Sequence, residues 1–194
     1  MTRQIVIVRY DARWRDEFRE IGAPLRAALG DRALRIDHIG STAVPGLAAK
    51  DRIDIQVTVA ALDEEPLARS LAPLGYALAT EIDHDHAPPG HEGDAPAEWR
   101  KLFFRAPEEQ RPTNLHVRQV GRANQRYALL FRDYLRVDQM ARGAYEQIKE
   151  ALARLHPDDV DAYYAVKDPV CDIVMAAAER WASASNYTIG PSDI

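Results

Sequence analysis

The sequence predicts an α+β domain in which flanking helices cover a mixed β-sheet and the last third of the chain is helical. Two observations lead to this fold class. The two-residue alternation of β-strands is confined to the first 120 residues. Beyond Gly121 the apolar residues recur every three to four positions, as they do on the buried face of a helix. We therefore expect one domain over 1–194, with an α+β core at about 1–120 and a helical extension at about 121–185.

The N-terminal elements follow from local patterns. Residues 4–8 are rich in β-branched residues and predict a first strand. From Asp11 the pattern is helical as far as Gly30, which supplies a C-terminal stop. Residues 34–39 predict the next strand. A loop with two glycines and a proline, 40–46, separates it from a strand at 53–59.

The middle of the chain combines a short helix with a long polar connection. Asp63 caps a predicted helix that ends near Leu74. Residues 80–98 hold three histidines among acids, prolines and glycines, without the regular spacing of metal ligands. We interpret this segment as at most a mobile lid, and we expect its acids at 81, 83 and 85 to be solvated.

Two further strands and the C-terminal helices complete the layout. The strands are expected at 100–105 and 114–120, and helices follow beyond Gly121. Pro169 is expected to split the last helix pair, because proline disrupts helix interiors. The tail after Ser183 is expected to be loosely held.

Composition narrows the function classes. The formal charge of -5 argues against general nucleic-acid binding, which depends on neutralising phosphates with Lys and Arg. Cys171 is the only cysteine, so neither an internal disulfide nor a cysteine-rich zinc site is expected. The sequence has no apolar run long enough to span a membrane and no apolar signal stretch at its start. We therefore expect a cytoplasmic protein that does not bind membranes.

The strands place several polar side chains on one sheet face. In the strand at 53–59 the isoleucines and valines share one face, so Asp54, Gln56 and Thr58 share the other. The same alternation groups polar residues on the next strands, namely Asn114, His116 and Arg118, and Lys101 and Arg105. If these strands are neighbours, an acid, an imidazole and several cations converge. A sheet with one solvated face would produce the same pattern.

The loop before Asp54 favours a functional interpretation. In nucleotidyltransferases resembling DNA polymerase beta, a Gly-Ser pair begins a short helix that holds nucleotide phosphates, and two acids on the next strand hold metals. Gly40, Ser41 and Asp54 have this arrangement. The position of the second acid is Gln56, however, and an uncharged amide is a poor magnesium ligand. A Gln56→Asp substitution is therefore expected to strengthen cation binding.

The stretch from His38 to Lys50 resembles the hallmark motif of the GrpB-like family, and shorter matches extend over nearly the whole chain. The family's fold belongs to the nucleotidyltransferase superfamily, so the resemblance implies that fold. Segment 50–57 is most similar to GrpB-like domains fused behind dephospho-CoA kinases, although this chain lacks a Gly-x-x-x-x-Gly-Lys-Ser/Thr motif. The matching segments are His38-Ile39-Gly40-Ser41-Thr42-Ala43-Val44-Pro45-Gly46-Leu47-Ala48-Ala49-Lys50, Tyr10-Asp11-Ala12-Arg13-Trp14, Asn114-Leu115-His116-Val117-Arg118, Phe131-Arg132-Asp133-Tyr134-Leu135-Arg136 and Tyr164-Ala165-Val166-Lys167.

These patterns predict a set of site residues. The predicted catalytic residues are Asp54, which would also hold magnesium or manganese, and His116. The predicted phosphate-binding residues are Gly40, Ser41, Thr42, Lys50, Arg105 and Lys167. Further candidates are His38, Gln56, Asn114 and Arg118. On the exposed side of a helix, Arg132 and Arg136 are expected to be solvated.

Three functions stay open at this point. The first is a nucleotidyltransferase-like domain that binds a nucleotide or another phosphorylated small molecule, with weak metal-dependent transferase activity. The second is a non-catalytic binding or regulatory module of the same fold, linked to coenzyme A metabolism. The third is hydrolysis at a single metal held by Asp54 and His116. The sequence identifies neither the substrate nor a protein partner.

Overall fold

A single mixed sheet organises the chain in a computed structural model that describes residues 4–91 and 93–194. The strand order is β1-β2-β5-β4-β3. Strands β2 and β5 run parallel, and the other neighbouring pairs are antiparallel. The strands are β1 (Ala33–Ile39), β2 (Ile53–Val59), β3 (Ala77–Leu78), β4 (Leu102–Arg105) and β5 (Thr113–Gln119).

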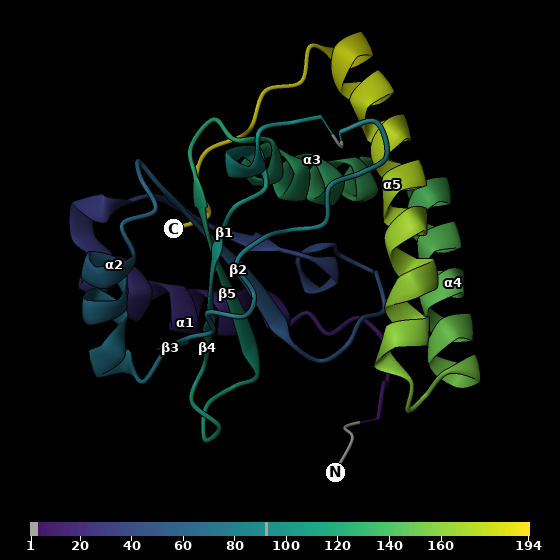
Figure 1. The fold of residues 1–194 in the computed structure, drawn as a ribbon. Helices are drawn as coiled ribbons and strands as arrows, with labels where there is room; N and C mark the ends of the chain where they lie inside the picture. The colour runs from purple at the N-terminus through teal and green to yellow at the C-terminus, as the bar shows by residue number, and fades with distance from the viewer. Residues whose placement is uncertain (1–3, 92) are drawn as a thin grey trace.

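Helices cover both faces of this sheet. Helices α1 and α2 lie on one side, and α3, α4 and α5 lie on the other, with α4 and α5 side by side (Figure 1). The helices are α1 (Trp14–Leu29), α2 (Glu64–Leu71), α3 (Ala123–Val137), α4 (Gln139–Leu155) and α5 (Val160–Ser185). The sequence prediction of an α+β fold with a mixed sheet and a helical last third is confirmed.

The main hydrophobic core lies between the sheet and helices α1 and α2. Ile53, Ile55 and Val57 of β2 are fully buried there. Each aliphatic side chain of this size stabilises the fold by about 1.5–3 kcal/mol when it leaves water. The alternation of β2 thus directs its apolar residues into this core and its polar residues toward α3, α4 and α5.

Smaller apolar clusters attach the three C-terminal helices to each other and to the loop after β1. Leu130 and Tyr134 of α3 pack against Met175 and Ala178 of α5. A second cluster joins the loop after β1 to α3 and α4 through Val44, Leu47, Leu135 and Tyr145. These contacts fix α4 and α5 over the polar face of the sheet.

Two predictions are wrong, namely the strand at residues 4–8 and the helix break at Pro169. Residues 4–8 form no strand of the sheet; they make one β-bridge, between Val8 and Ala49, and Ile5 is buried against α4 and α5 instead. Helix α5 continues through Pro169. The Pro169 residue is exposed, and packing along α3 and α4 holds the helix together despite the lost hydrogen bond.

The C-terminal tail is also held more firmly than its sequence suggests. Residues 187–194 run back along the free edge of β1, and Figure 1 shows the chain end beside that strand. The backbone N–H of Ile194 donates to the carbonyl oxygen of Ile36 (3.2 Å), while the Ser192 hydroxyl accepts from the N–H of Ile36 (2.9 Å). The side chain of Asp193 accepts from the N–H of His38 (3.0 Å). The tail therefore occupies backbone groups that an edge strand would otherwise leave open.

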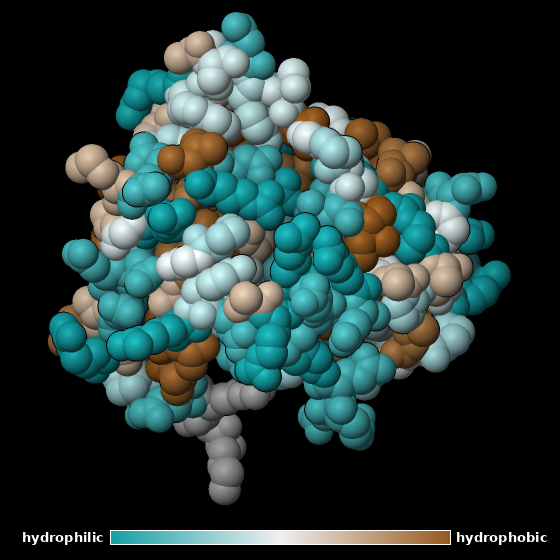
Figure 2. All heavy atoms as spheres, turned by 180° about the vertical axis from the view of Figure 1, so that it is seen from behind, coloured by the Kyte–Doolittle hydropathy of each residue, from teal (hydrophilic) through white to brown (hydrophobic). Residues whose placement is uncertain are grey.

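The surface carries separate apolar spots. Figure 2 shows one face on which hydrophobic residues lie scattered among hydrophilic ones. Several exposed apolar residues lie on α4 and α5, including Met140, Leu155 and Ile173. Among the helices of the described residues, none combines the length and the apolar character needed to cross a membrane.

Candidate functional site

Gly40 brings the loop after β1 into close contact with Asp54. Its backbone has φ +70° and ψ −169°, which side-chain-bearing residues rarely adopt. A Cβ at this position would lie 2.5 Å from Oδ2 of Asp54, so only glycine fits. The loop continues as a short 3-10 helix, η2 (Ser41–Ala43), whose end is held by Arg136 donating to the carbonyl oxygen of Ala43.

Asp54 lies at the start of β2, directly opposite Asn114 of β5. The Asn114 amide donates to Oδ1 of Asp54 (2.7 Å), and its own oxygen accepts from Nη1 of Arg52 (2.9 Å). The Asp54 side chain is 27% exposed, and loss of water around the carboxylate raises its pKa despite the Asn114 hydrogen bond and the nearby cations. The alignment of polar strand faces that the sequence predicts is confirmed.

His116 lies on the same sheet face as Asp54, with Nε2 4.0 Å from Oδ1. Burial, together with the positive charges of Arg118 and Lys101, lowers the pKa of His116 well below its usual value. The imidazole is therefore neutral near pH 7. Its Nδ1 lies 3.4 Å from an Arg118 nitrogen, which can only donate. Nδ1 is then the acceptor, and the hydrogen is on Nε2, the ring nitrogen nearer to Asp54.

Gln56 is fully buried and engaged at both ends of its amide. Its oxygen accepts from Nη1 of Arg118 (2.7 Å), and its nitrogen donates to the carbonyl oxygen of Gln125 in α3 (3.1 Å). The predicted role of Gln56 and Arg118 at a ligand is therefore not supported by their contacts. They belong to a buried polar network. It lies beside Asp54, Asn114 and His116, which we call the Asp54 cluster.

Asp85, from the long connection between β3 and β4, is the centre of that network. Arg118 donates to both of its oxygens (2.7 and 2.9 Å), and Lys101 donates at 2.7 Å. Burial alone would raise the pKa of Asp85, but Arg118 and Lys101 hold it well below its usual value. The expectation that Asp85 is solvated is wrong, because this part of the connection folds onto the sheet.

The donors do not fit a two-cation centre. Such a centre needs two carboxylates that share the cations, and the position of the second is Gln56, whose oxygen already accepts from a guanidinium. Within the described ranges 4–91 and 93–194, no group of three or more His, Cys, Asp or Glu side chains is placed to hold a metal. Of Asp54 and Asp85, the second is engaged by Arg118 and Lys101, and Asp54 stays available as an acidic ligand.

Cations from the loop and from α5 lie near Asp54, namely Lys50, Arg52 and Lys167. The ammonium of Lys50 lies 4.1 Å above the ring of Tyr163 and 3.4 Å from the hydroxyl of Tyr164. Burial, helped by the charges of Lys167 and Arg52, lowers the pKa of Lys50 to about 8. The charge of Lys167 also lowers the pKa of Asp54 and of Lys149, so Lys167 lies within electrostatic reach of each of them.

Three predicted phosphate or ligand contacts have other partners. Arg105 is exposed, pairs with Glu81 and lies two strands from Asp54. The hydroxyl of Thr42 donates to the carbonyl oxygen of Arg52 and bonds to Nε2 of His38. His38 faces the α1 core, stacked on Phe18, and burial lowers its pKa to about 3. Thr42 and His38 thus hold the loop in place, and Arg105 is engaged with Glu81 instead of Asp54.

Sequence reasoning misses the contacts of three cations, Arg132, Arg52 and Lys149. Arg132, expected to be solvated, is 3% exposed and donates to the carbonyl oxygen of His38 and to Asp193. Arg52 is also missed, because its contact is with Asn114 of a strand about 60 residues later, which a local pattern does not show. Lys149 had a readable signal: it falls between Tyr145 and Leu152 on the buried stripe of α4.

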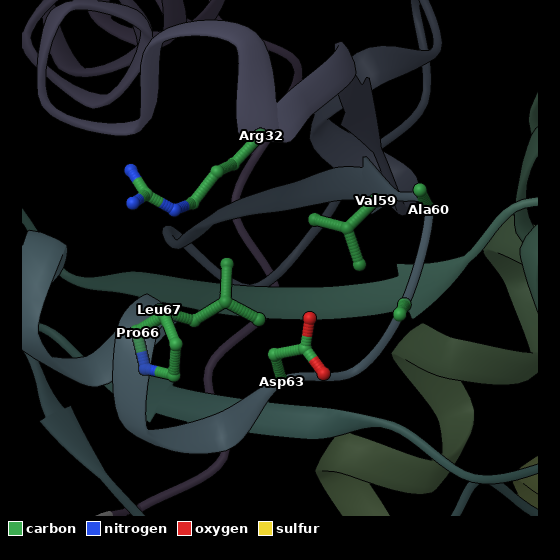
Figure 3. A pocket seen from close by; sticks show the side chains of 7 residues that line it. Arg32, Val59, Ala60, Asp63, Pro66 and Leu67 are labelled. Atoms are coloured by element: carbon green, nitrogen blue, oxygen red, sulfur yellow. The ribbon is translucent and has the colours of Figure 1, made fainter.

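Two surface hollows lie away from Asp54. One is formed at the far end of β2, where Figure 3 shows Arg32, Asp63 and Leu67 around it. The other lies beside the start of α1 and is lined by charged residues that already pair with one another, such as Arg111 with Asp51 and Glu17. Neither includes a residue of the Asp54 cluster.

Comparison with known proteins identifies relatives over almost the whole chain. A family model described as "GrpB protein" matches residues 4–177. A protein named dephospho-CoA kinase from Mycolicibacterium paratuberculosis is 40% identical over 96% of this chain and 50% of its own length. A UPF0157 protein of Halalkalibacterium halodurans is 31% identical over 90% of this chain and 82% of its own. The chain thus spans about half the length of the dephospho-CoA kinases that it matches.

A solved structure has a similar fold. The crystal structure of the conserved protein GrpB from Enterococcus faecalis matches with a TM-score of 0.69 and 28% identity, over 91% of this chain and 99% of that one. A cytoplasmic RNA terminal U-transferase gives a TM-score of 0.49 at 15% identity, over 76% of this chain and 43% of that one, which is too low to establish a shared fold.

Proposed function

This chain is a member of the GrpB protein family, and we propose that it binds a nucleotide or another phosphorylated small molecule beside Asp54. The observation that carries the proposal is the excess of positive charge there. Lys50, Arg52 and Lys167 lie within electrostatic reach of Asp54, and Lys149 lies within reach of Lys167. Burial and the charge of Lys167 lower the pKa of both Lys50 and Lys149, and an anionic ligand would relieve the repulsion between these cations.

The remaining groups suit the other parts of such a ligand. The ring of Tyr164 is 41% exposed beside Lys50 and offers an aromatic surface. Asn114 and the neutral His116 offer hydrogen-bonding groups next to Asp54. Asp54 would attract either a hydroxyl group of the ligand or one magnesium or manganese ion. A cytoplasmic location agrees with a ligand of this class.

Catalysis is a narrower question than binding. Nucleotidyl transfer by two shared cations would need a second carboxylate, and Gln56 with its Arg118 partner does not provide one. We therefore propose binding as the primary function and expect transferase activity to be weak or undetectable.

A second candidate function follows from the names of the relatives. Proteins named dephospho-CoA kinase match this chain over about half of their length. A non-catalytic module that binds coenzyme A or its precursor would agree with that arrangement and with the cation cluster.

A ligand panel tests both candidates. Nucleoside triphosphates, coenzyme A and dephospho-CoA are titrated by calorimetry, each with magnesium, with manganese and with chelator. Binding that weakens with salt and with Lys50→Met supports the phosphate proposal. Preference for dephospho-CoA over all nucleoside triphosphates selects the second candidate. If no phosphorylated compound binds or raises the melting temperature, the proposed function is wrong.

A further inference from the structure

A buried lysine on α4 contacts the serine of the Gly40 loop. Lys149 is 2% exposed. Its ammonium donates to the hydroxyl oxygen of Ser41 (2.9 Å) and to the carbonyl oxygen of Ala48 (2.6 Å), and it lies 4.8 Å from the centre of the Tyr145 ring. Among the described residues, no carboxylate lies within ion-pair distance of it. A buried ammonium without such a partner is costly, which indicates a purpose other than stability.

This contact fixes the direction of the Ser41 hydroxyl. An ammonium has only hydrogens to offer, so the oxygen of Ser41 must be the acceptor. Its own hydrogen is then left for another group, and no side chain or carbonyl within residues 4–91 and 93–194 accepts it. Ser41 is partly exposed, whereas Lys149 is not. A ligand would therefore meet the hydroxyl hydrogen first, with the positive charge directly behind it.

We propose that Ser41 and Lys149 form an anion subsite, in which the Ser41 hydroxyl donates to a phosphate oxygen and Lys149 acts as a positioning residue behind it. The subsite deepens the proposed function and rests on it. Because the charge comes from a lysine, this part of the ligand needs no divalent cation. The ligand class is a compound with a terminal phosphate or diphosphate. An uncharged compound would gain nothing from the ammonium behind Ser41.

Proton uptake should accompany binding at this subsite. Burial, helped by the charge of Lys167 on α5, lowers the pKa of Lys149 to about 7, although Glu146 and Glu150 on α4 and Cys171 on α5 oppose the shift. Tyr145 contributes its ring from the same helix. A bound anion favours the charged ammonium and so raises this pKa. Protons are then taken up near pH 8, and affinity falls as the pH rises above about 7.

The test uses pyrophosphate and ATP as probes, both in chelator, with the full chain. Lys149→Met and Ser41→Ala should each weaken binding about tenfold, since each removes one charge-assisted contact. The double variant should be no weaker than about tenfold, because the lysine acts through the serine. Arg154→Met, which removes an exposed cation from the same helix, is the control and should bind as the unaltered protein does.

Calorimetry in two buffers with different ionisation enthalpies supplies a second readout. Proton uptake near pH 8 should be present in the unaltered protein and smaller in Lys149→Met. If Lys149→Met does not fold, Ser41→Ala and the proton uptake of the unaltered protein decide the matter. Full-strength binding by Lys149→Met, fully multiplying effects in the double variant, or the absence of proton uptake would overturn this inference and leave the proposed function standing. Failure of the unaltered protein to bind any phosphorylated probe would overturn both.

Discussion

At the scale of single residues, Gly40 connects the loop to the candidate site. Its backbone angles exclude most side chains, and its Cα lies against the carboxylate of Asp54. Gly46, in the same loop, also has a positive φ of +82°, but nothing lies within 4 Å of where its Cβ would be. A side chain at either position would strain the backbone, but only one at position 40 would also collide with Asp54.

We expect Gly40→Ala to destabilise the fold more than Gly46→Ala. Each substitution strains the backbone by about 1–3 kcal/mol, but only Gly40→Ala also pushes Asp54 aside. Urea unfolding should show a difference of at least about 1 kcal/mol between the two variants. Equal stabilities would mean that Asp54 can move away freely. Ligand binding, measured in parallel, should weaken only in Gly40→Ala.

His38 predicts a pH dependence of stability. Its pKa is about 3 in the folded chain, because it is buried and near Arg136 and Arg132. Below about pH 6.5 His38 binds a proton in the unfolded chain but not in the folded chain, so the free energy of unfolding decreases as the pH is lowered. Between pH 7 and pH 5 the loss from this residue should be about 2 kcal/mol. A His38→Gln variant should lose less over the same range, and urea unfolding at both pH values measures this. Identical slopes would contradict the prediction.

The sequence was informative about Asp54 and less so about its surroundings. Alternation along β2 and β5 is enough to place Asp54, Asn114 and His116 on one face, because strand geometry fixes which side each residue takes. The partners of Gln56 could not be read in this way. Its nitrogen donates to Gln125 of α3, and Asp85 of the connection after β3 holds its other partner, Arg118; the positions of both segments depend on tertiary packing.

At the scale of elements, the connection between β3 and β4 holds a charged residue inside the fold. Asp85 pairs with Lys101 of the segment before β4 and with Arg118 of β5, and it accepts from Asn124 of α3. The connection is thereby anchored to two parts of the sheet and one helix. Nearby Asp83, by contrast, is 63% exposed and pairs with His84.

We expect Asp85→Asn to be strongly destabilising and Asp83→Asn to have little effect. Removing the Asp85 charge leaves Arg118 and Lys101 buried without their acid, which costs about 3–5 kcal/mol in comparable pairs. Asp83→Asn makes the same chemical change two residues away, at a side chain that is exposed to solvent, where an ion pair contributes little to stability. Urea unfolding of both variants measures the difference. A mild Asp85→Asn variant would show that the network is dispensable.

The same network changes the expectation for Gln56→Asp. From the sequence, this variant should bind cations more strongly. In the structure, a carboxylate at position 56 would meet Nη1 of Arg118, and an ion pair would compete with the metal. We therefore expect Gln56→Asp to gain little manganese affinity by calorimetry. Gln56→Asp combined with Arg118→Gln should gain more. Strong binding by the single variant would contradict this account.

The length of α5 could not be predicted from local sequence patterns. The periodicity beyond Gly121 predicts helices, but it does not predict that α5 passes through Pro169. That outcome depends on the apolar contacts of Met175, Ala178 and Ala182 with α3, beyond the proline. Packing of this kind stabilises helices more than local propensity does, so a local pattern cannot report it.

At the scale of the whole molecule, the tail at 187–194 joins the chain's end to the first strand of its sheet. Arg26 of α1 donates to the carbonyl oxygen of Ile194 (2.8 Å), and the Ile194 side chain lies against Gly22. Asp193 also accepts from Arg132 of α3 (2.9 Å). The tail thus contacts both helical layers as well as β1.

We expect deletion of residues 187–194 to lower stability and to cause self-association. The deletion uncovers the edge of β1, whose free backbone groups can pair with another chain. It also removes Asp193 from the buried Arg132. Light scattering and thermal unfolding of the shortened chain measure both effects. A monomer with an unchanged melting temperature would show that the tail contacts are dispensable. Ser183→Ala, at an exposed position of α5, serves as the control.

The position of this tail also has a consequence for biosynthesis. A ribosome makes β1 early and makes residues 187–194 after every other described part of the fold. During translation the edge of β1 therefore stays open for most of the time the domain takes to emerge. Exposed strand edges are the sites at which nascent chains associate wrongly. Fast translation, or a chaperone that shields β1, would then raise the yield of native protein more than it raises the stability of the finished fold.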